Sequence, residues 1–311
     1  MITRRHAFGI AAGAFALAAT PALAQSWKGS HPELVFAVVP AENASGVTER
    51  FQPFIEYLSK ELGVKVTLRI ANDYAAVIEG QRAGNIHVAY YGPASYARAF
   101  ITGVKVEPFV TARNADGSLG FYSVTYVLAK SPYQKIADLK GKTLGLVDPN
   151  STSGNQAPRF FLNRDGYDVD KFFGKHVYAG SHENAILALA QGTVDAAANW
   201  WNADDDSNLT RMLKKGMLKN ADGSAMQQSD FRIVYKSELL PGSPFAYLTA
   251  LPVELKAAIN KAFVESPVKA KAAFDKLSDG KDIGFVPMTA KDYEPMVQMV
   301  RFVDEMRKKR S

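Results

Sequence analysis

The densest group of potential ligand-binding side chains is a run of polar residues at 148–154. It reads Asp-Pro-Asn-Ser-Thr-Ser-Gly and follows an apolar stretch that ends at Val147. A helix that starts here exposes backbone N–H groups at the positive end of its dipole. The hydroxyl groups of Ser151, Thr152 and Ser153 add further donors. This pattern predicts an anion site suited to a phosphate-like group. The alternative is simple helix capping, for which one hydroxyl is enough.

Tyrosines are candidates at two other predicted helix starts. A tyrosine can donate one hydrogen bond while its ring forms a pocket wall. Tyr74 opens a predicted helix and could point into a cleft. Tyr90 and Tyr91 end a predicted strand, and strand alternation places one of the two in the core.

A histidine and a tryptophan pair complete the candidates. His182 begins a predicted helix and could donate to an anion, although an isolated histidine is more often structural. Trp200 and Trp201 end a predicted strand, where they could form a pocket wall. All these positions lie at the carboxyl ends of strands or at the next helix start, where open α/β sheets bind ligands.

Other chemistries lack their sequence patterns. There are no cysteines, and the five histidines do not have the spacing of a zinc site. Gly141-Lys142-Thr143 resembles the end of a Walker A motif, but the required earlier glycine is replaced by Ile136. The sequence contains neither a dinucleotide-binding G-x-G-x-x-G nor a hydrolase G-x-S-x-G motif. A net charge of +6 over 311 residues is too weak to indicate nucleic-acid binding. We predict no cofactor and no metal.

Short apolar strands and amphipathic helices alternate along the chain and must position these residues. The predicted strands are 34–39, 64–70, 86–91, 121–129, 143–147, 176–178, 194–199 and 231–235. The predicted helices are 49–62, 74–83, 93–101, 154–162, 183–191, 204–214, 252–263, 267–277 and 291–307. Repeated strand–helix units favour parallel sheets with helices on their faces.

The pattern restarts after the β-rich run at 121–129, which predicts an α/β fold with two lobes. We expect lobe 1 to comprise residues 25–122 and 240–311, and lobe 2 residues 123–239. Two crossovers form a two-segment hinge, and the ligand site lies in the cleft between the lobes.

The N-terminal segment predicts export. Residues 1–24 contain a basic start, an apolar stretch and an Ala-x-Ala cleavage pattern, so we predict a signal peptide cut between Ala24 and Gln25. Arg4-Arg5 leaves both the twin-arginine route and the general secretory route open. The expected location of the remaining chain is the periplasm.

The chain resembles the phosphonate-class periplasmic substrate-binding proteins of ABC transporters. The resemblance covers roughly residues 33–300, and its most specific piece is the run at 148–154. It implies a type II binding-protein fold that closes on its ligand, and a membrane permease as partner. It also implies that the ligand's oxygens are held by the following residues: Tyr74, Tyr91, Ser151, Thr152, Ser153 and His182.

Two positions depart from family members that bind 2-aminoethylphosphonate. Those proteins hold the ammonium with two carboxylates, and the matching positions here are Asn202 and Ser243. A desolvated ammonium without a carboxylate partner is costly. We therefore expect phosphite, methylphosphonate or another alkylphosphonate as ligand. The alternative is 2-aminoethylphosphonate itself, with a carboxylate from 204–206 shifted into the site.

Two other functional classes stay open at this point. An exported enzyme acting on a phosphate ester could use the same anion site, with His182 and Asp148 as acid and base. A sensor subunit that presents its ligand to a membrane receptor would have the same sequence features. We expect a binding protein, not an enzyme, and a monomer.

Overall fold

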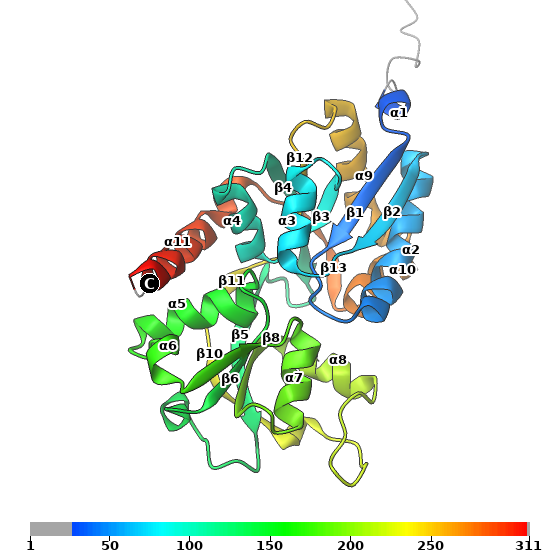
Figure 1. The fold of residues 1–311 in the computed structure, drawn as a ribbon. Coiled ribbons are helices and arrows are strands. Elements are labelled where there is room, and N and C mark those ends of the chain that lie inside the picture. The colour runs from blue at the N-terminus through cyan, green and yellow to red at the C-terminus, as the bar shows by residue number, and fades with distance from the viewer. Residues whose placement is uncertain (1–26, 310–311) are drawn as a thin grey trace, which may run out of the picture.

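Two β-sheets, each covered by helices, build the two halves of the molecule (Figure 1). The computed structural model describes residues 27–309. The predicted signal peptide and its cleavage site lie outside these residues. The two-lobed α/β architecture expected from the sequence is confirmed, while the predicted lobe boundaries stay a prediction.

Lobe 1 is built on a six-stranded mixed sheet in the order β13-β4-β12-β3-β1-β2. Its strands are β1 (Glu33–Val38), β2 (Lys65–Ile70), β3 (Val88–Tyr90), β4 (Val106–Asn114), β12 (Pro244–Leu248) and β13 (Asp282–Pro287). β1, β2 and β3 are parallel, and β12 pairs antiparallel with both β3 and β4. Its helices are α1 (Trp27–Ser30), α2 (Ala44–Leu62), α3 (Tyr74–Arg82), α4 (Pro93–Ile101), α9 (Val253–Lys269), α10 (Lys271–Ser278) and α11 (Glu294–Lys308).

Lobe 2 is built on a second sheet in the order β10-β5-β8-β6-β7. Its strands are β5 (Gly120–Leu128), β6 (Thr143–Leu146), β7 (Lys175–Tyr178), β8 (Ala196–Ala203), β9 (Asp206–Ser207), β10 (Phe231–Lys236) and the short β11 (Leu240–Pro241), which pairs with β5. Its α-helices are α5 (Ala157–Arg164), α6 (Val169–Phe172), α7 (His182–Ala190) and α8 (Asn208–Lys214). A π-helical turn at Thr152–Gln156 runs directly into α5, and short 3₁₀ segments lie at Ile136–Leu139, Gln228–Asp230 and Ala290–Tyr293.

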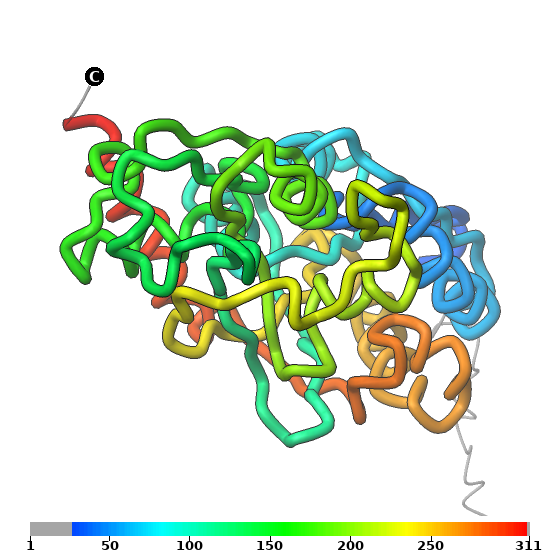
Figure 2. Tube along the Cα trace, turned by 90° about the horizontal axis from the view of Figure 1, so that it is seen from below, coloured from blue at the N-terminus to red at the C-terminus, as the bar shows by residue number. Residues whose placement is uncertain are grey.

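The chain crosses between the sheets twice, from β4 to β5 and from β11 to β12. Helix α11 then packs against α4 of lobe 1 and α5 of lobe 2, through an apolar cluster that includes Ala97, Phe161 and Val300. Figure 2 shows this C-terminal helix running beside lobe 2. The lobes are therefore joined by two crossovers and by one packed helix.

Most predicted elements are present, with shifts that local chemistry explains. The helix predicted at 49–62 begins earlier, because the side chain of Asn43 caps its first turn through the N–H of Gly46. The helix predicted at 204–214 begins only at Asn208, because Ser207 and Thr210 form a capping box there. Strands β4, β12 and β13 were not predicted, since their polar residues and prolines obscure the strand pattern.

Candidate functional site

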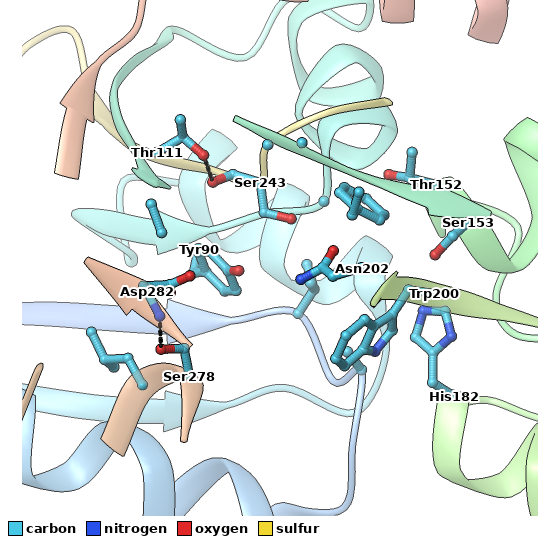
Figure 3. A pocket seen from close by; sticks show the side chains of 18 of the residues that line it. Tyr90, Thr111, Thr152, Ser153, His182, Trp200, Asn202, Ser243, Ser278 and Asp282 are labelled. Atoms are coloured by element: carbon cyan, nitrogen blue, oxygen red, sulfur yellow. Dashed lines mark hydrogen bonds between the residues drawn. The ribbon is translucent and has the colours of Figure 1, made fainter. Parts of the chain in front are cut away.

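A cavity of about 160 Å³ lies between the two lobes, with walls from both. Figure 3 shows labelled residues of lobe 1, such as Tyr90 and Ser243, facing labelled residues of lobe 2, such as Thr152 and His182. The cavity therefore lies between the lobes, where the sequence pattern predicted a cleft. Of the ten predicted site residues, eight line it: Tyr74, Ser151, Thr152, Ser153, His182, Trp200, Asn202 and Ser243.

One end of the cavity is the start of the π-helical turn. Ser151 is its N-cap and accepts a hydrogen bond from the Gly154 N–H at 3.1 Å. A side chain at Gly154 would place its Cβ 2.3 Å from a methyl group of Val147, so only glycine permits this tight turn. The carbonyl of Ser153 accepts from the hydroxyl of Ser123 at 2.8 Å, which fixes the turn against β5. The first-turn N–H groups and the Ser153 hydroxyl are thereby held at the cavity wall (Figure 3).

Thr152 connects the same turn to lobe 1. Its hydroxyl oxygen accepts a hydrogen bond from the backbone N–H of Ala94, in the first turn of α4, at 2.9 Å. Gly92 precedes that turn, and a Cβ at this position would lie 2.8 Å from the Thr152 hydroxyl. The lobes are therefore in close contact at the end of the cavity formed by residues 151–153.

His182 lies beside the serines as the first residue of α7. Its Nε2 is 3.4 Å from the Ser151 hydroxyl, and its backbone N–H donates to the carbonyl of Ala41 in lobe 1 at 2.9 Å. The Asn199 side chain donates to the His182 carbonyl at 2.9 Å and fixes the helix start to β8. Burial lowers the pKa of His182 to about 3, so the imidazole is neutral at pH 7. It can offer one N–H to an anion without carrying a charge.

The tyrosines divide as strand alternation requires. Tyr74 lines the cavity and burial raises its pKa, while the Ser151 side chain opposes that rise from across the cleft. Tyr91 does not line the cavity. It is fully buried in the hydrophobic core with Ala89 and Tyr96. Tyr90 lines the cavity instead, because consecutive residues at a strand end point to opposite sides.

The tryptophans divide in the same way. Trp200 lines the cavity and stacks on the guanidinium of Arg211 at 4.7 Å. Trp201 faces away from the cavity and packs against Tyr122, with the Lys236 ammonium 3.8 Å from its ring centre. Its predicted place on the pocket wall is therefore not what the structure shows.

The other end of the cavity holds charged residues that the motifs did not single out. These are Arg50 of α2, Arg211 of α8, Asp206 of β9 and Asp282 of β13. Arg50 pairs with Glu42, and Arg211 lies 3.6 Å from Asp206. The acidic stretch at 204–206 was the only sequence signal for any of them. Helix-face arginines and a residue of the unpredicted strand β13 have no local pattern that marks them.

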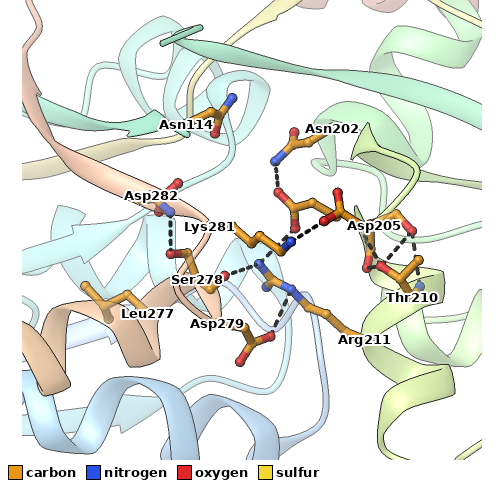
Figure 4. Close-up of polar contacts among 12 residues, drawn as sticks. Asn114, Asn202, Asp205, Thr210, Arg211, Leu277, Ser278, Asp279, Lys281 and Asp282 are labelled. Atoms are coloured by element: carbon orange, nitrogen blue, oxygen red, sulfur yellow. Dashed lines mark hydrogen bonds and ion pairs between the residues drawn. The ribbon is translucent and has the colours of Figure 1, made fainter. Parts of the chain in front are cut away.

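Further contacts join the lobes around the cavity. The buried carboxylate of Glu183 on α7 accepts from the backbone and side-chain N–H groups of Asn43, both at 2.7 Å. Lys281, just before β13 of lobe 1, forms an ion pair with Asp205, just before β9 of lobe 2 (Figure 4). The structure therefore represents a closed arrangement of the two lobes.

The geometry fits binding better than catalysis. The Ser151 hydroxyl already caps the helix, and the Nδ1 of His182 contacts no hydrogen-bond partner within residues 27–309. A serine nucleophile would require a histidine oriented by a third group. The same range contains no group of three or more potential metal ligands, and none of its helices is long and apolar enough to cross a membrane. Fold and site define a two-lobed anion-binding protein.

Comparisons with known proteins assign the family. Residues 36–293 match the family described as the phosphonate periplasmic substrate-binding protein of ABC transporters. The chain belongs to this family of periplasmic substrate-binding proteins, whose members serve transport and are not enzymes.

Two curated relatives extend over most of the chain. The phosphate-import protein PhnD of Mycolicibacterium smegmatis is 32% identical over 85% of this chain and 84% of its own. The phosphonates-binding periplasmic protein of Escherichia coli is 31% identical over 78% of this chain and 70% of its own.

Solved structures agree on the fold. The binding component of a phosphonate ABC transporter from Pseudomonas aeruginosa has a TM-score of 0.76 at 24% identity, covering 88% of this chain and 87% of that one. PhnD1 of Prochlorococcus marinus, solved with methylphosphonate, has a TM-score of 0.72 at 21% identity, covering 88% and 98%.

Proposed function

We propose that this protein captures a small phosphorus oxyanion in the periplasm and delivers it to a membrane permease. The observation that carries this proposal is the turn at 151–153, which presents hydroxyl and backbone N–H donors to an interlobe cavity beside the neutral His182. Charge-assisted hydrogen bonds at a helix start, shielded from water, are the strong type. The names of the curated relatives support a phosphate- or phosphonate-like ligand.

In this proposal the oxyanion is held from both lobes. Ser151, Thr152, Ser153 and His182 contact it from lobe 2, and Tyr74 contacts it from lobe 1. Because the ligand touches both lobes, it stabilises the closed arrangement over any open one. The protein acts as a monomer after its signal peptide is removed.

Calorimetric titration of the ligand-free protein tests the proposal. We expect tight binding of at least one of phosphite, methylphosphonate, 2-aminoethylphosphonate and phosphate, and weak binding of sulfate. Replacing Ser151 and Thr152 together by alanine should weaken that binding about a hundredfold or more, because several charge-assisted hydrogen bonds are lost. The circular dichroism spectrum should stay unchanged.

A matched double variant on the surface controls for general effects. Thr48→Ala with Ser224→Ala removes two exposed hydroxyls that do not line the cavity and make no interlobe contact. Equal affinity in the Ser151/Thr152 variant and in this control would show that the oxyanion binds elsewhere.

A further inference from the structure

The end of the cavity remote from the serines contains a carboxylate that forms no ion pair with any residue of the part of the chain that the structure describes. Asp282 lines the cavity at the start of β13. Among residues 27–309, no lysine, arginine or histidine nitrogen lies within 4.0 Å of its carboxylate. Figure 3 shows Asp282 beside Tyr90, on the side of the cavity opposite Thr152 and Ser153.

The nearby cations already have acidic partners. Arg211 lies 3.6 Å from Asp206 and 3.3 Å from Asp279, and Lys281 pairs with Asp205 (Figure 4). Arg50 pairs with Glu42. The polar cluster around this end of the cavity therefore carries more acids than bases.

Two acceptor oxygens on this wall also lack a hydrogen bond among residues 27–309, and the one donor there in the same state, the Nε of Arg211, faces Asp279 at 3.3 Å. The Asn202 amide donates to the Oδ2 of Asp206 at 2.7 Å, which fixes its orientation. The Oδ1 atoms of both Asn202 and Asp206 are buried and accept no hydrogen bond. Both residues line the cavity. A ligand group rich in donors and positively charged would complement this wall, because an ammonium has three donors and no acceptor.

We propose that Asp282 is a specificity-determining residue that binds a protonated amine carried by the phosphorus oxyanion, with Asn202 and Asp206 completing the subsite. The inference rests on the proposed function, since the oxyanion must occupy the other end of the cavity. It replaces the expectation drawn from Asn202 and Ser243 alone. Those two positions are neutral, but the structure brings in carboxylates from β9 and β13.

Burial supports this assignment. Asp282 is a half-buried residue of the cavity wall, and burial of its carboxylate raises its pKa to about 6, although Ser278 and Arg211 lower it. Arg50 also lowers the pKa, whereas Asp206 raises it further. A partly desolvated carboxylate without an ion-pair partner is stabilised most strongly by a cationic group of the ligand.

A pair of ligands with the same shape tests the proposal. 2-Aminoethylphosphonate and propylphosphonate differ in one terminal group, ammonium against methyl. We expect the protein to bind the amine at least about tenfold more tightly in calorimetric titration. Asp282→Asn should remove that preference and leave the affinity for propylphosphonate within about threefold.

Asp275→Asn is the matched control, because it removes one partly exposed carboxylate of α10 that does not line the cavity. It should keep the preference for the amine. Two results would overturn the subsite: equal affinity of the unmodified protein for both ligands, or a preference that survives Asp282→Asn. Failure to bind either phosphonate, or phosphate, would instead contradict the proposed function.

Discussion

At the scale of single residues, Asp282 links ligand choice to stability. Its pKa is raised from 3.8 to about 6 in the folded protein, chiefly by burial. The folded state therefore binds a proton more tightly than the unfolded chain does, so stability falls as pH rises from about 4 to about 6. Above pH 6 the ionised Asp282 lowers the free energy of unfolding by about 2 kcal/mol, a value reduced from the full pKa shift because the side chain is partly exposed to the cavity.

Asp282→Asn should therefore stabilise the ligand-free protein at pH 7.5. We expect the free energy of unfolding to rise by about 2 kcal/mol there and by much less at pH 4, where the aspartate is protonated in the folded protein and about half ionised in the unfolded chain. Urea unfolding followed by circular dichroism at the two pH values measures this. An equal gain at both values would mean that charge burial is not the cause, and Asp275→Asn should show no gain at either.

At the scale of elements, the start of α4 limits how closely the lobes approach. Gly92 has an ordinary backbone conformation, with φ −75°, so alanine fits there unless lobe 2 is near. In the closed structure its Cβ would lie 2.8 Å from the Thr152 hydroxyl. Overpacking of this kind costs about 1–3 kcal/mol.

Gly92→Ala should therefore weaken ligand binding about tenfold, while urea unfolding of the ligand-free protein is little changed. Calorimetric titration with the tightest-binding phosphonate measures the effect. Gly29→Ala is the control, because a Cβ there meets no atom within 4 Å. Unchanged affinity in Gly92→Ala would show that the bound state is more open at this contact than the structure.

Site residues within a single turn could be predicted from the sequence, whereas residues placed by strand ends or strand pairing could not. The turn at 151–153 is a local feature, since cap, helix start and hydroxyl donors are consecutive residues. Its place in an interlobe cavity followed from the strand–helix pattern. The choice between Tyr90 and Tyr91 required the exact end of β3, and Asp282 required β13, a strand held by pairing with β4 rather than by its own sequence. Residues that tertiary pairing brings to a site leave no local signal.

At the scale of the whole molecule, binding depends on the balance between closed and open lobes. Helix α11 packs on both lobes and the two crossovers restrict their separation, so closure is a hinge motion within a connected frame. The contacts between residues of different lobes then determine the free energy of closure. One of them involves a buried charge: Glu183 of lobe 2 is 3% exposed and accepts two hydrogen bonds from Asn43 of lobe 1.

Glu183→Ala should shift this balance toward the open state. The variant removes two interlobe hydrogen bonds to a carboxylate, so we expect ligand affinity to fall about tenfold or more. Small-angle X-ray scattering of the ligand-free variant should give a larger radius of gyration than the unmodified protein, and saturating ligand should restore the compact value. Glu183→Gln keeps the shape and one acceptor, so its loss of affinity should be smaller. If Glu183→Ala binds as tightly as the unmodified protein, the contact with Asn43 does not contribute to closure, and the remaining interlobe contacts, such as those of Thr152 with Ala94 and of Lys281 with Asp205, stabilise the closed state without it.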